Sequence, residues 1–192
     1  MLKVIAEDMG AFYQHYPRAA TIVTTSHNGR KNAMAVAWHC SISFKPPLYG
    51  IAVSPKRFTY HLITDSGQFG INFMPYALVE KIAAVGGSNG SIINKFTEFN
   101  LAEDKPIKTE VPVLRDAYAA YECKVIENKL CGDHAWIIGE IVAAHVAGEI
   151  ITENGVLDLQ VVQPALYLGG DYYCSTDKKS LKFLEREKYG KK

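Results

Sequence analysis

The chain lacks the long apolar stretches that mark membrane spans and secretory signals. A membrane-spanning helix needs about 18 or more consecutive apolar residues, and no run in these 192 residues approaches that length. The N-terminal segment carries Glu7 and Asp8 where a signal peptide has its apolar region. The sequence therefore predicts a cytoplasmic protein that makes no contact with a membrane.

Cysteine is scarce, and its spacing excludes the common metal and dithiol motifs. The chain has four cysteines, Cys40, Cys123, Cys131 and Cys174, and no two of them form a Cys-x-x-Cys pair. This argues against a thioredoxin-type dithiol, a zinc ribbon and an iron–sulfur site. Cys131-x-x-His134 is half of a metal motif, but the other histidines show no paired ligand spacing. We expect free thiols and no metal.

The chain also lacks an excess of charge of either sign. It has 21 basic and 20 acidic side chains, a net charge of +1, and no block of like charge except Lys191-Lys192. Affinity for a nucleic-acid backbone requires a concentrated basic face, so we predict no nucleic-acid partner. With 48% hydrophobic and 21% charged residues, the composition is that of one globular domain over residues 1–192.

The first half of the chain is organised around a strand of small and polar residues. Residues 19–26 form a β-branched run, and Asn28-Gly29 is a tight hairpin turn. The next strand, residues 32–44, carries Ala and Ser where a core strand carries Leu, Ile and Val. It ends at Pro46-Pro47, and residues 48–53 form a third strand. We predict a three-stranded meander whose middle strand lies against something other than side chains.

A helix with basic residues in its first turn follows the meander. Ser54-Pro55 is a helix start signal, and Lys56, Arg57 and Thr59 follow it. Cations at a helix N-terminus are unfavourable by roughly 0.3–1 kcal/mol each, whereas a bound anion reverses that cost. Two interpretations stay open at this point, a phosphate site and a solvated charged turn.

The rest of the chain favours antiparallel strands with few helices. We expect an irregular or helical lead-in at residues 1–17 and helices at 55–66, 77–85 and 179–188. Further strands are expected at 68–74, 118–130 and 134–146, a loop or short strand at 167–173, and a long loop at 88–112 with one helical turn at 91–96. About six strands in long hairpins favour a closed or split barrel over a parallel sheet. No Gly-x-Gly-x-x-Gly follows a strand, so a Rossmann dinucleotide site is unsupported.

These motifs resemble one known family in their order. The chain has Asn-Gly-Arg at 28–30, Asn-Ala-Met-Ala at 32–35, Ser-x-Ser-Phe-x-Pro-Pro-Leu at 41–48, Ser-Pro-Lys-Arg-Phe-Thr-Tyr-x-Leu-Ile at 54–63 and Phe-Gly-Ile-Asn at 69–72. Gly-Asp-His at 132–134, Gly-Glu-Ile-Val at 139–142 and Leu-Tyr-Leu-Gly-Gly at 166–170 follow. Together they resemble the flavin reductase-like family of FMN-binding split barrels, closest to its flavoredoxin and archaeal ferric-reductase branch.

The resemblance implies a mainly β fold, a Greek-key split barrel that forms a homodimer with FMN near the interface; FAD remains possible. It places one segment along the flavin ring and ribityl chain: Met34, Ala35, Val36, Ala37, Trp38, His39, Cys40 and Ser41. It places Ser54, Lys56, Arg57 and Thr59 at the phosphate and Asn72 close to the cofactor. Three of these residues also have a purely structural interpretation. Trp38 can fill the core, Cys40 can be a small buried hydrophobic residue, and Asn72 can cap or hydrogen-bond locally at a strand end. Lys95 is either a second phosphate cation or a solvated lysine.

His134 is the one catalytic candidate. The resemblance places the Gly-Asp-His motif where nicotinamide or substrate approaches the flavin, so His134 has a role in positioning or proton supply; a structural turn histidine is the alternative. The predicted function is FMN-dependent hydride transfer from NAD(P)H to flavin, with onward reduction of free flavin, a ferric complex or another acceptor. The alternatives are a flavoredoxin-type electron carrier that ignores nicotinamide, and a flavin-binding module without turnover.

Overall fold

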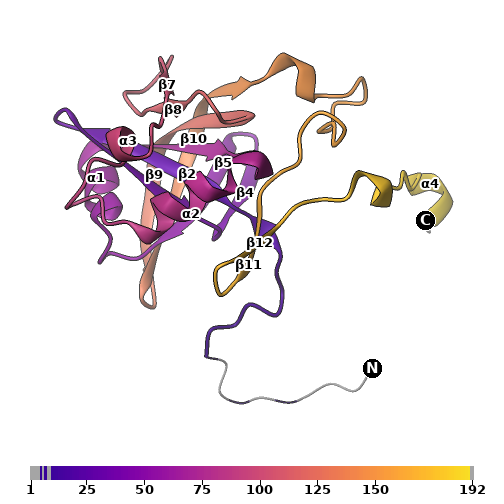
Figure 1. Cartoon of the computed structure of the whole chain (residues 1–192), viewed down its shortest axis with the longest axis horizontal. Helices are drawn as coiled ribbons and strands as arrows, with labels where there is room; N and C mark the ends of the chain where they lie inside the picture. The colour runs from indigo at the N-terminus through magenta and orange to yellow at the C-terminus, as the bar shows by residue number, and fades with distance from the viewer. Residues whose placement is uncertain (1–4, 6, 8–9, 191–192) are drawn as a thin grey trace.

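The computed structural model describes residues 5, 7 and 10–190, and its body is a β-barrel with short helices (Figure 1). Residues 10–17 are irregular, in line with the predicted lead-in; the rest of that segment, like Lys191-Lys192, lies largely outside the described residues. The strands are β1 Arg18–Ala19, β2 Thr21–His27, β3 Arg30–Val36, β4 His39–Phe44, β5 Pro47–Val53, β6 Gln68–Phe73, β7 Glu103–Asp104, β8 Val113–Leu114, β9 Ala119–Cys131, β10 His134–Val146, β11 Leu166–Gly169 and β12 Tyr172–Cys174. The helices are α1 Phe58–Ser66, α2 Val79–Gly87, α3 Lys95–Glu98 and α4 Arg186–Tyr189, with 3-10 turns η1 Tyr76–Leu78, η2 Gly148–Ile150 and η3 Lys178–Ser180.

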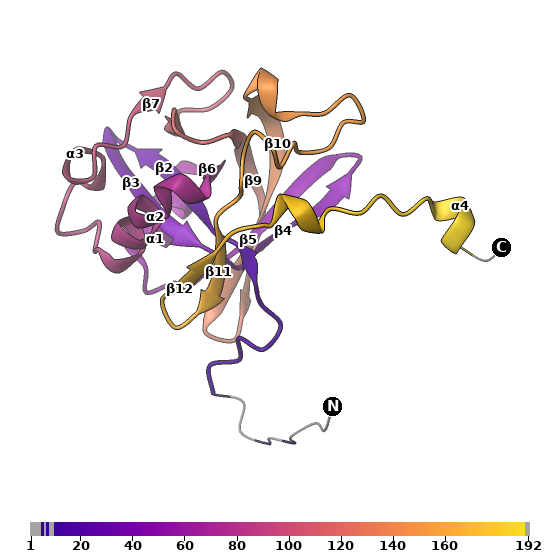
Figure 2. The ribbon, with the colours of Figure 1, turned by 45° about the vertical axis from the view of Figure 1, so that its right-hand side comes forward.

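Seven strands form one antiparallel sheet in the order β3-β2-β6-β9-β10-β5-β4 (Figure 2). The two strands at the ends of this order, β3 and β4, are consecutive in the chain with only Ala37 and Trp38 between them. The sheet therefore closes into a barrel at this bend. There the Ala52 amide donates to the Trp38 carbonyl at 2.8 Å. A small second sheet, β1-β11-β12, lies beside it.

The predicted middle strand, residues 32–44, is in fact two strands. Its first half, β3, pairs with β2, and its second half, β4, pairs with β5. The pairings of the predicted meander are confirmed, but its single middle strand is wrong, because the chain turns a corner at Ala37-Trp38 and each half lies at a different end of the sheet. The predicted hairpin turn at Asn28-Gly29 is confirmed, with φ of 49° and 75° at these residues.

The helices match the predictions unevenly. α1 begins at Phe58 rather than near Pro55, because residues 55–57 form a turn in which the Arg57 amide donates to the Ser54 carbonyl at 2.9 Å. α2 agrees with the predicted 77–85 helix and runs on through Gly87. The predicted helix at 179–188 is wrong, since only η3 and α4 form in an otherwise extended tail. An isolated polar segment of this length gains too little from packing to nucleate a helix.

The loop at 88–112 is ordered by a buried carboxylate. The helical turn expected at 91–96 occurs at α3, a few residues later. Glu122 on β9 has a fully buried side chain and accepts from the amides of Ile107, Lys108 and Thr109 at 2.7–2.8 Å and from His145 Nε2 at 2.7 Å. Burial raises the pKa of Glu122, but the hydrogen bonds from these donors outweigh that effect and lower the pKa to about 2. The loop is therefore anchored to the barrel wall.

Two hydrophobic clusters lie on the two faces of the sheet. Val23, Ile51, Phe69 and Ile137 fill one, and the other is centred on Ile22, Met74, Ile82 and Val85, where α2 contributes two residues. Val23 and its neighbour Ile22 fall in different clusters because successive strand residues point to opposite faces. Both α1 and α2 contact β3, and these three elements frame the cavities described next. No helix of the described residues is long and apolar enough to cross a membrane.

Candidate functional site

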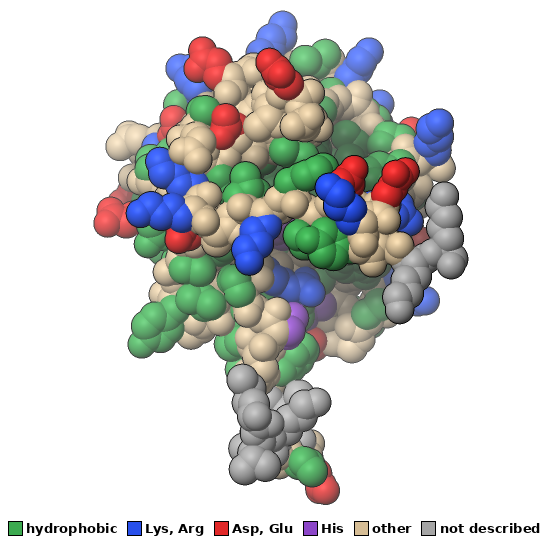
Figure 3. All heavy atoms as spheres, turned by 90° about the vertical axis from the view of Figure 1, so that its right-hand side faces the viewer, with side chains coloured by type: hydrophobic (Ala, Val, Ile, Leu, Met, Phe, Trp, Pro, Cys, Tyr) green, Lys and Arg blue, Asp and Glu red, His purple; other side chains and the backbone are tan. Residues whose placement is uncertain are grey.

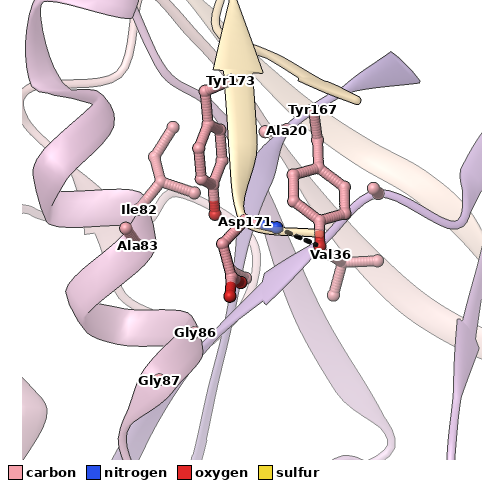
Figure 4. Close-up of a pocket in the computed structure, with 11 residues that line it drawn as sticks. Ala20, Val36, Ile82, Ala83, Gly86, Gly87, Tyr167, Asp171 and Tyr173 are labelled. Carbon is pink, nitrogen blue, oxygen red and sulfur yellow. Dashed lines mark hydrogen bonds between the residues drawn. The ribbon is translucent and has the colours of Figure 1, made fainter. Parts of the chain in front are cut away.

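Three cavities meet along β3, and each is named here by its lining. The basic cavity, about 250 Å³, is lined by Asn32, Met34, Ala35, Lys56, Arg57, Phe58, Thr59, Gly86, Gly87, Ser88, Asn89, Gly90 and Lys95. The aromatic cavity, about 280 Å³, is lined by Tyr13, Tyr16, Met34, Ala35, Val36, Ala37, Trp38, Ala52, Val53, Ser54, Arg57, His134 and Tyr167. The tyrosine cavity, about 500 Å³, is lined by Ala20, Ala35, Val36, Ala37, Ile82, Ala83, Gly86, Gly87, Tyr167, Asp171 and Tyr173 (Figure 4).

The start of α1 gives the basic cavity its positive end. Arg57 occupies the N-cap with extended backbone, no side chain caps the helix, and the first turn carries no acidic residue. Lys56 and Arg57 are exposed at the cavity wall. Free helix N–H groups, the helix dipole and two cations all favour an anion at this position. The turn that the sequence offers as a phosphate site therefore borders a cavity in the structure.

A buried polar pair forms the inner wall of the basic cavity. Asn32 Nδ2 donates to Thr59 Oγ1 at 2.9 Å, and both side chains are buried. Thr59 accepts this bond, which leaves its hydroxyl hydrogen for an acceptor in the cavity. Gly90 packs against Asn32 so closely that a Cβ at position 90 would lie 2.0 Å from Asn32 Oδ1. The loop after α2 must therefore be glycine at this point to close the cavity.

Lys95 is a third cation of the basic cavity and is not the solvated lysine of the alternative prediction. Its residue is only 4% exposed, and Nζ donates to the carbonyls of Ala33 and Val85 at 2.9 and 2.7 Å. Burial, followed by the charge of Arg57, lowers the pKa of Lys95 to about 8. The ammonium has three N–H donors, so one is left for an anion. Such an anion would hold the proton on Lys95.

Backbone and aromatic rings line the aromatic cavity. The segment 34–38 forms one wall and residues 52–54 another, so Ser54 belongs to this cavity and not to the basic one. β3 stands at the end of the strand order, and an edge strand presents N–H and C=O groups without a ladder partner. A planar ring with polar edges can use both the flat space and these backbone groups.

His134 and Trp38 stand together at this cavity. Their ring centroids are 4.7 Å apart, and Trp38 Nε1 donates to the Tyr16 hydroxyl at 2.5 Å. His134 Nδ1 lies 2.9 Å from Asp133 Oδ1, which fixes the ring and leaves Nε2 for a ligand. The hydrogen bond from His134 holds the pKa of Asp133 below its usual range.

The other predicted residues lie away from these cavities. His39 is held by Tyr49 Oη at 2.7 Å and the Ala19 carbonyl at 2.9 Å, and burial lowers its pKa, so it is a neutral structural histidine. His39 and Cys40 line a separate cavity of about 260 Å³, and Ser41 is exposed on β4. The bend at residues 37–38 causes this, since β4 leaves for the other end of the sheet.

Asn72 is a core residue in the structure. Its side chain is fully buried, Nδ2 donates to the Ile22 carbonyl at 2.9 Å, and Oδ1 accepts from the Leu114 amide at 2.8 Å. Both ends of the amide are therefore engaged by the barrel and β8. These partners are 50 and 42 residues away in sequence, so the local cap is wrong as well, and Asn72 lines none of the three cavities.

Sequence reasoning missed two groups of lining residues. The first is the loop 88–90 together with Gly86 and Gly87, which the sequence presents only as a helix end. The second is the set of tyrosines at 13, 16 and 167. A Gly-Gly pair followed by Asn-Gly was a usable signal for a loop that approaches a ligand closely. The tyrosines come from segments 150 residues apart, and nothing local connects them.

One face of the molecule, the one that Figure 3 shows, carries mixed charge. On the face shown in Figure 3, basic, acidic and hydrophobic side chains are interspersed. Among the described residues, no group of three or more His, Cys, Asp or Glu side chains is placed to hold a metal ion.

Comparison with known proteins places the chain among flavin proteins. A family model described as "Flavin reductase like domain" matches residues 13–175. An uncharacterised Aeropyrum pernix protein is 31% identical over 155 residues, 80% of this chain, which spans only 58% of that relative's length. A ferric-chelate reductase (NAD(P)H) of Archaeoglobus fulgidus is 30% identical over 149 residues, 76% of this chain and 86% of that protein.

A solved structure shares the whole fold. The FMN-binding protein from Thermus thermophilus with bound 1-cyclohex-2-enone superposes with a TM-score of 0.85 at 27% identity, covering 95% of this chain and 99% of that one. Solved split-barrel flavin proteins have this architecture, which confirms the predicted mainly β split barrel.

Proposed function

Because this chain belongs to the flavin reductase-like family, we propose that it is an FMN-dependent oxidoreductase that takes hydride from NAD(P)H. The observation that carries the proposal is the junction of the basic and aromatic cavities. They share Met34, Ala35 and Arg57, so an anion in one is joined directly to a flat site in the other. A flavin mononucleotide has this combination of a terminal phosphate and a planar ring.

FMN suits the basic cavity better than FAD. The cavity holds about 250 Å³ and gathers Lys56, Arg57 and Lys95 around the start of one helix, which matches a single terminal phosphate. The residues of the cavity therefore fit the smaller cofactor, and Gly90 and the Thr59 hydroxyl complete its lining.

The reaction divides between the cofactor and the chain. When bound, the flavin supplies the hydride and electron chemistry. The backbone of 34–38 and 52–54 orients the ring and offers N–H groups that stabilise negative charge at its polar edge. Arg57 joins the two cavities and fixes the phosphate. His134, oriented by Asp133, positions the second reactant or supplies a proton from Nε2.

The finer assignments follow the family resemblance. We propose a cytoplasmic homodimer, and exposed apolar side chains on β4, Ile42 at 40% and Phe44 at 92% exposure, give a surface for a second copy to cover. The related ferric-chelate reductase (NAD(P)H) supports a ferric complex as one acceptor. Light scattering at two protein concentrations checks the dimer.

An anaerobic visible spectrum with FMN bound tests the proposal. Bleaching of the band near about 450 nm on addition of NADH or NADPH is the expected result. A flavin that stays oxidised with both nucleotides but bleaches with dithionite contradicts the nicotinamide step, and makes an electron carrier with protein partners the better account. Failure to take up FMN contradicts the flavin site itself.

A further inference from the structure

The tyrosine cavity has no role in the function proposed so far, and it is the largest of the three. Its volume is about 500 Å³, within the range of about 300–1,000 Å³ that small-molecule sites have. The walls are the middle and C-terminal end of α2, the end of β3 and the β11–β12 hairpin. Figure 4 shows α2 on one side and the rings of Tyr167 and Tyr173 on the other.

The lining is apolar except at one end. Seven of its residues are Ala, Val, Ile or Gly on β3, α2 and the segment before β2, including Val36, Ile82 and Ala83. Such walls exclude water and favour flat apolar surface, and the two tyrosine rings offer faces for an aromatic ligand. The Tyr167 and Tyr173 centroids are 5.1 Å apart, so the rings support one another and form one wall.

Asp171 is the single charged side chain of this lining. It lies at the tip of the β11–β12 hairpin with φ of 65°, and its amide donates to the Tyr167 hydroxyl at 3.5 Å. Figure 4 shows its carboxylate between the tyrosines and the end of α2. Among the described residues the carboxylate has no hydrogen-bond or ion-pair partner. It therefore gives the cavity a negative end that accepts hydrogen bonds.

The tyrosine cavity joins the proposed flavin site. It shares Ala35, Val36, Ala37 and Tyr167 with the aromatic cavity, and Ala35, Gly86 and Gly87 with the basic cavity. A ligand held here would lie beside the ring site and away from the cations that hold the phosphate. The position is that of a second substrate.

We propose that the tyrosine cavity binds a planar aromatic molecule that is uncharged or cationic, and that Asp171 selects it against anions. Its role as a second-substrate site rests on the proposed function, whereas its ligand class rests on the cavity alone. Anionic chelates are then excluded from this cavity and must meet the flavin elsewhere.

The test uses three bicyclic probes of similar shape and different charge: N-methylquinolinium, quinoline and 2-naphthoate. FMN-saturated protein without reductant is titrated with each probe by calorimetry and by perturbation of the flavin spectrum. We expect the cation to bind about 10-fold more tightly than the anion, because an exposed carboxylate contributes about threefold in each direction. Asp171→Asn removes most of that preference, and Asp65→Asn, an exposed carboxylate on α1, leaves it unchanged.

A second variant guards against a folding artefact. Ala83→Trp fills the cavity from the exposed side of α2, and it is expected to weaken all three probes at least about 10-fold while the melting temperature stays within a few degrees. Glu80→Trp, on the same helix but outside this lining, is the matched control.

Three results overturn the inference: no order of affinity by charge, an order that survives Asp171→Asn, or probe binding that FMN abolishes, which would make the cavity part of the flavin site. The titrations are repeated without FMN. If the protein takes up no flavin, the charge order and its loss in Asp171→Asn still decide the ligand class separately from the proposed function.

Discussion

Replacing Arg57 by Ala tests the joined cavities most directly. Arg57 lines both the basic and the aromatic cavity and stands at the N-cap of α1. A charged hydrogen bond contributes roughly 1.5–3 kcal/mol, and because Arg57 is exposed we take the lower end. Arg57→Ala should therefore weaken FMN by about 1.5 kcal/mol, a factor of about 10. Lys56→Ala should act in the same direction and less strongly.

The comparison ligand is riboflavin, which has the ring and lacks the phosphate. Quenching of flavin fluorescence gives both dissociation constants for each variant. Riboflavin affinity should change little, and the loss of FMN affinity should shrink with salt, since the Debye length falls from about 30 Å at 0.01 M to about 3 Å at 1 M. Arg115→Ala, which breaks an exposed pair with Asp104 outside the cavities, is the control.

Equal losses for FMN and riboflavin in Arg57→Ala would refute the reasoning. They would mean that Arg57 acts on the ring or on the fold of the 54–57 turn. Unfolding in urea distinguishes these two cases, because a folding defect lowers the free energy of unfolding of the ligand-free protein as well.

Further outcomes follow from buried groups. FMN affinity, unlike riboflavin affinity, should fall above about pH 8 as Lys95 loses its proton, by no more than about tenfold per pH unit since one proton is linked. Glu122→Gln should lower the free energy of unfolding by about 2–3 kcal/mol, and the stability that wild-type Glu122 contributes above its unfolded pKa should be lost as pH falls from about 4.5 to about 2. Gly90→Ala should weaken FMN and cost about 1–3 kcal/mol by displacing Asn32, whereas Gly148→Ala, with open space around it, should be near neutral.

The first two of these predictions each have a contrary result. A pH-independent FMN affinity between about pH 7 and about pH 9.5, on either side of the Lys95 pKa, would separate Lys95 from the phosphate. For Lys95 in the free protein the lowered pKa has the opposite effect on folding, because the unfolded chain binds more protons above about pH 8 and stability then rises with pH. Unchanged urea midpoints for Glu122→Gln, measured beside Glu127→Gln on the same strand, would contradict its anchoring role.

Local signals predicted the elements that local chemistry controls. Asn28-Gly29 and Gly132 place hairpin turns because those positions need positive φ, and the structure has both turns. The apolar runs on either side became β2, β5, β6, β9 and β10 near their expected bounds. The helix expected at 179–188 failed for the complementary reason, since no packing partner stabilises it and propensity alone is weak.

The sequence by itself determined the barrel strands, the turns and the segments that carry the cations, because periodicity and turn chemistry act over a few residues. Only the tertiary structure decided that residues 32–44 bend at Trp38, that His39 and Asn72 are held by carbonyl groups of other strands, and that Lys95 is buried beside Arg57. Those outcomes depend on which strands close the sheet and on which carbonyls need donors. Such long-range conditions leave no periodic trace in the chain.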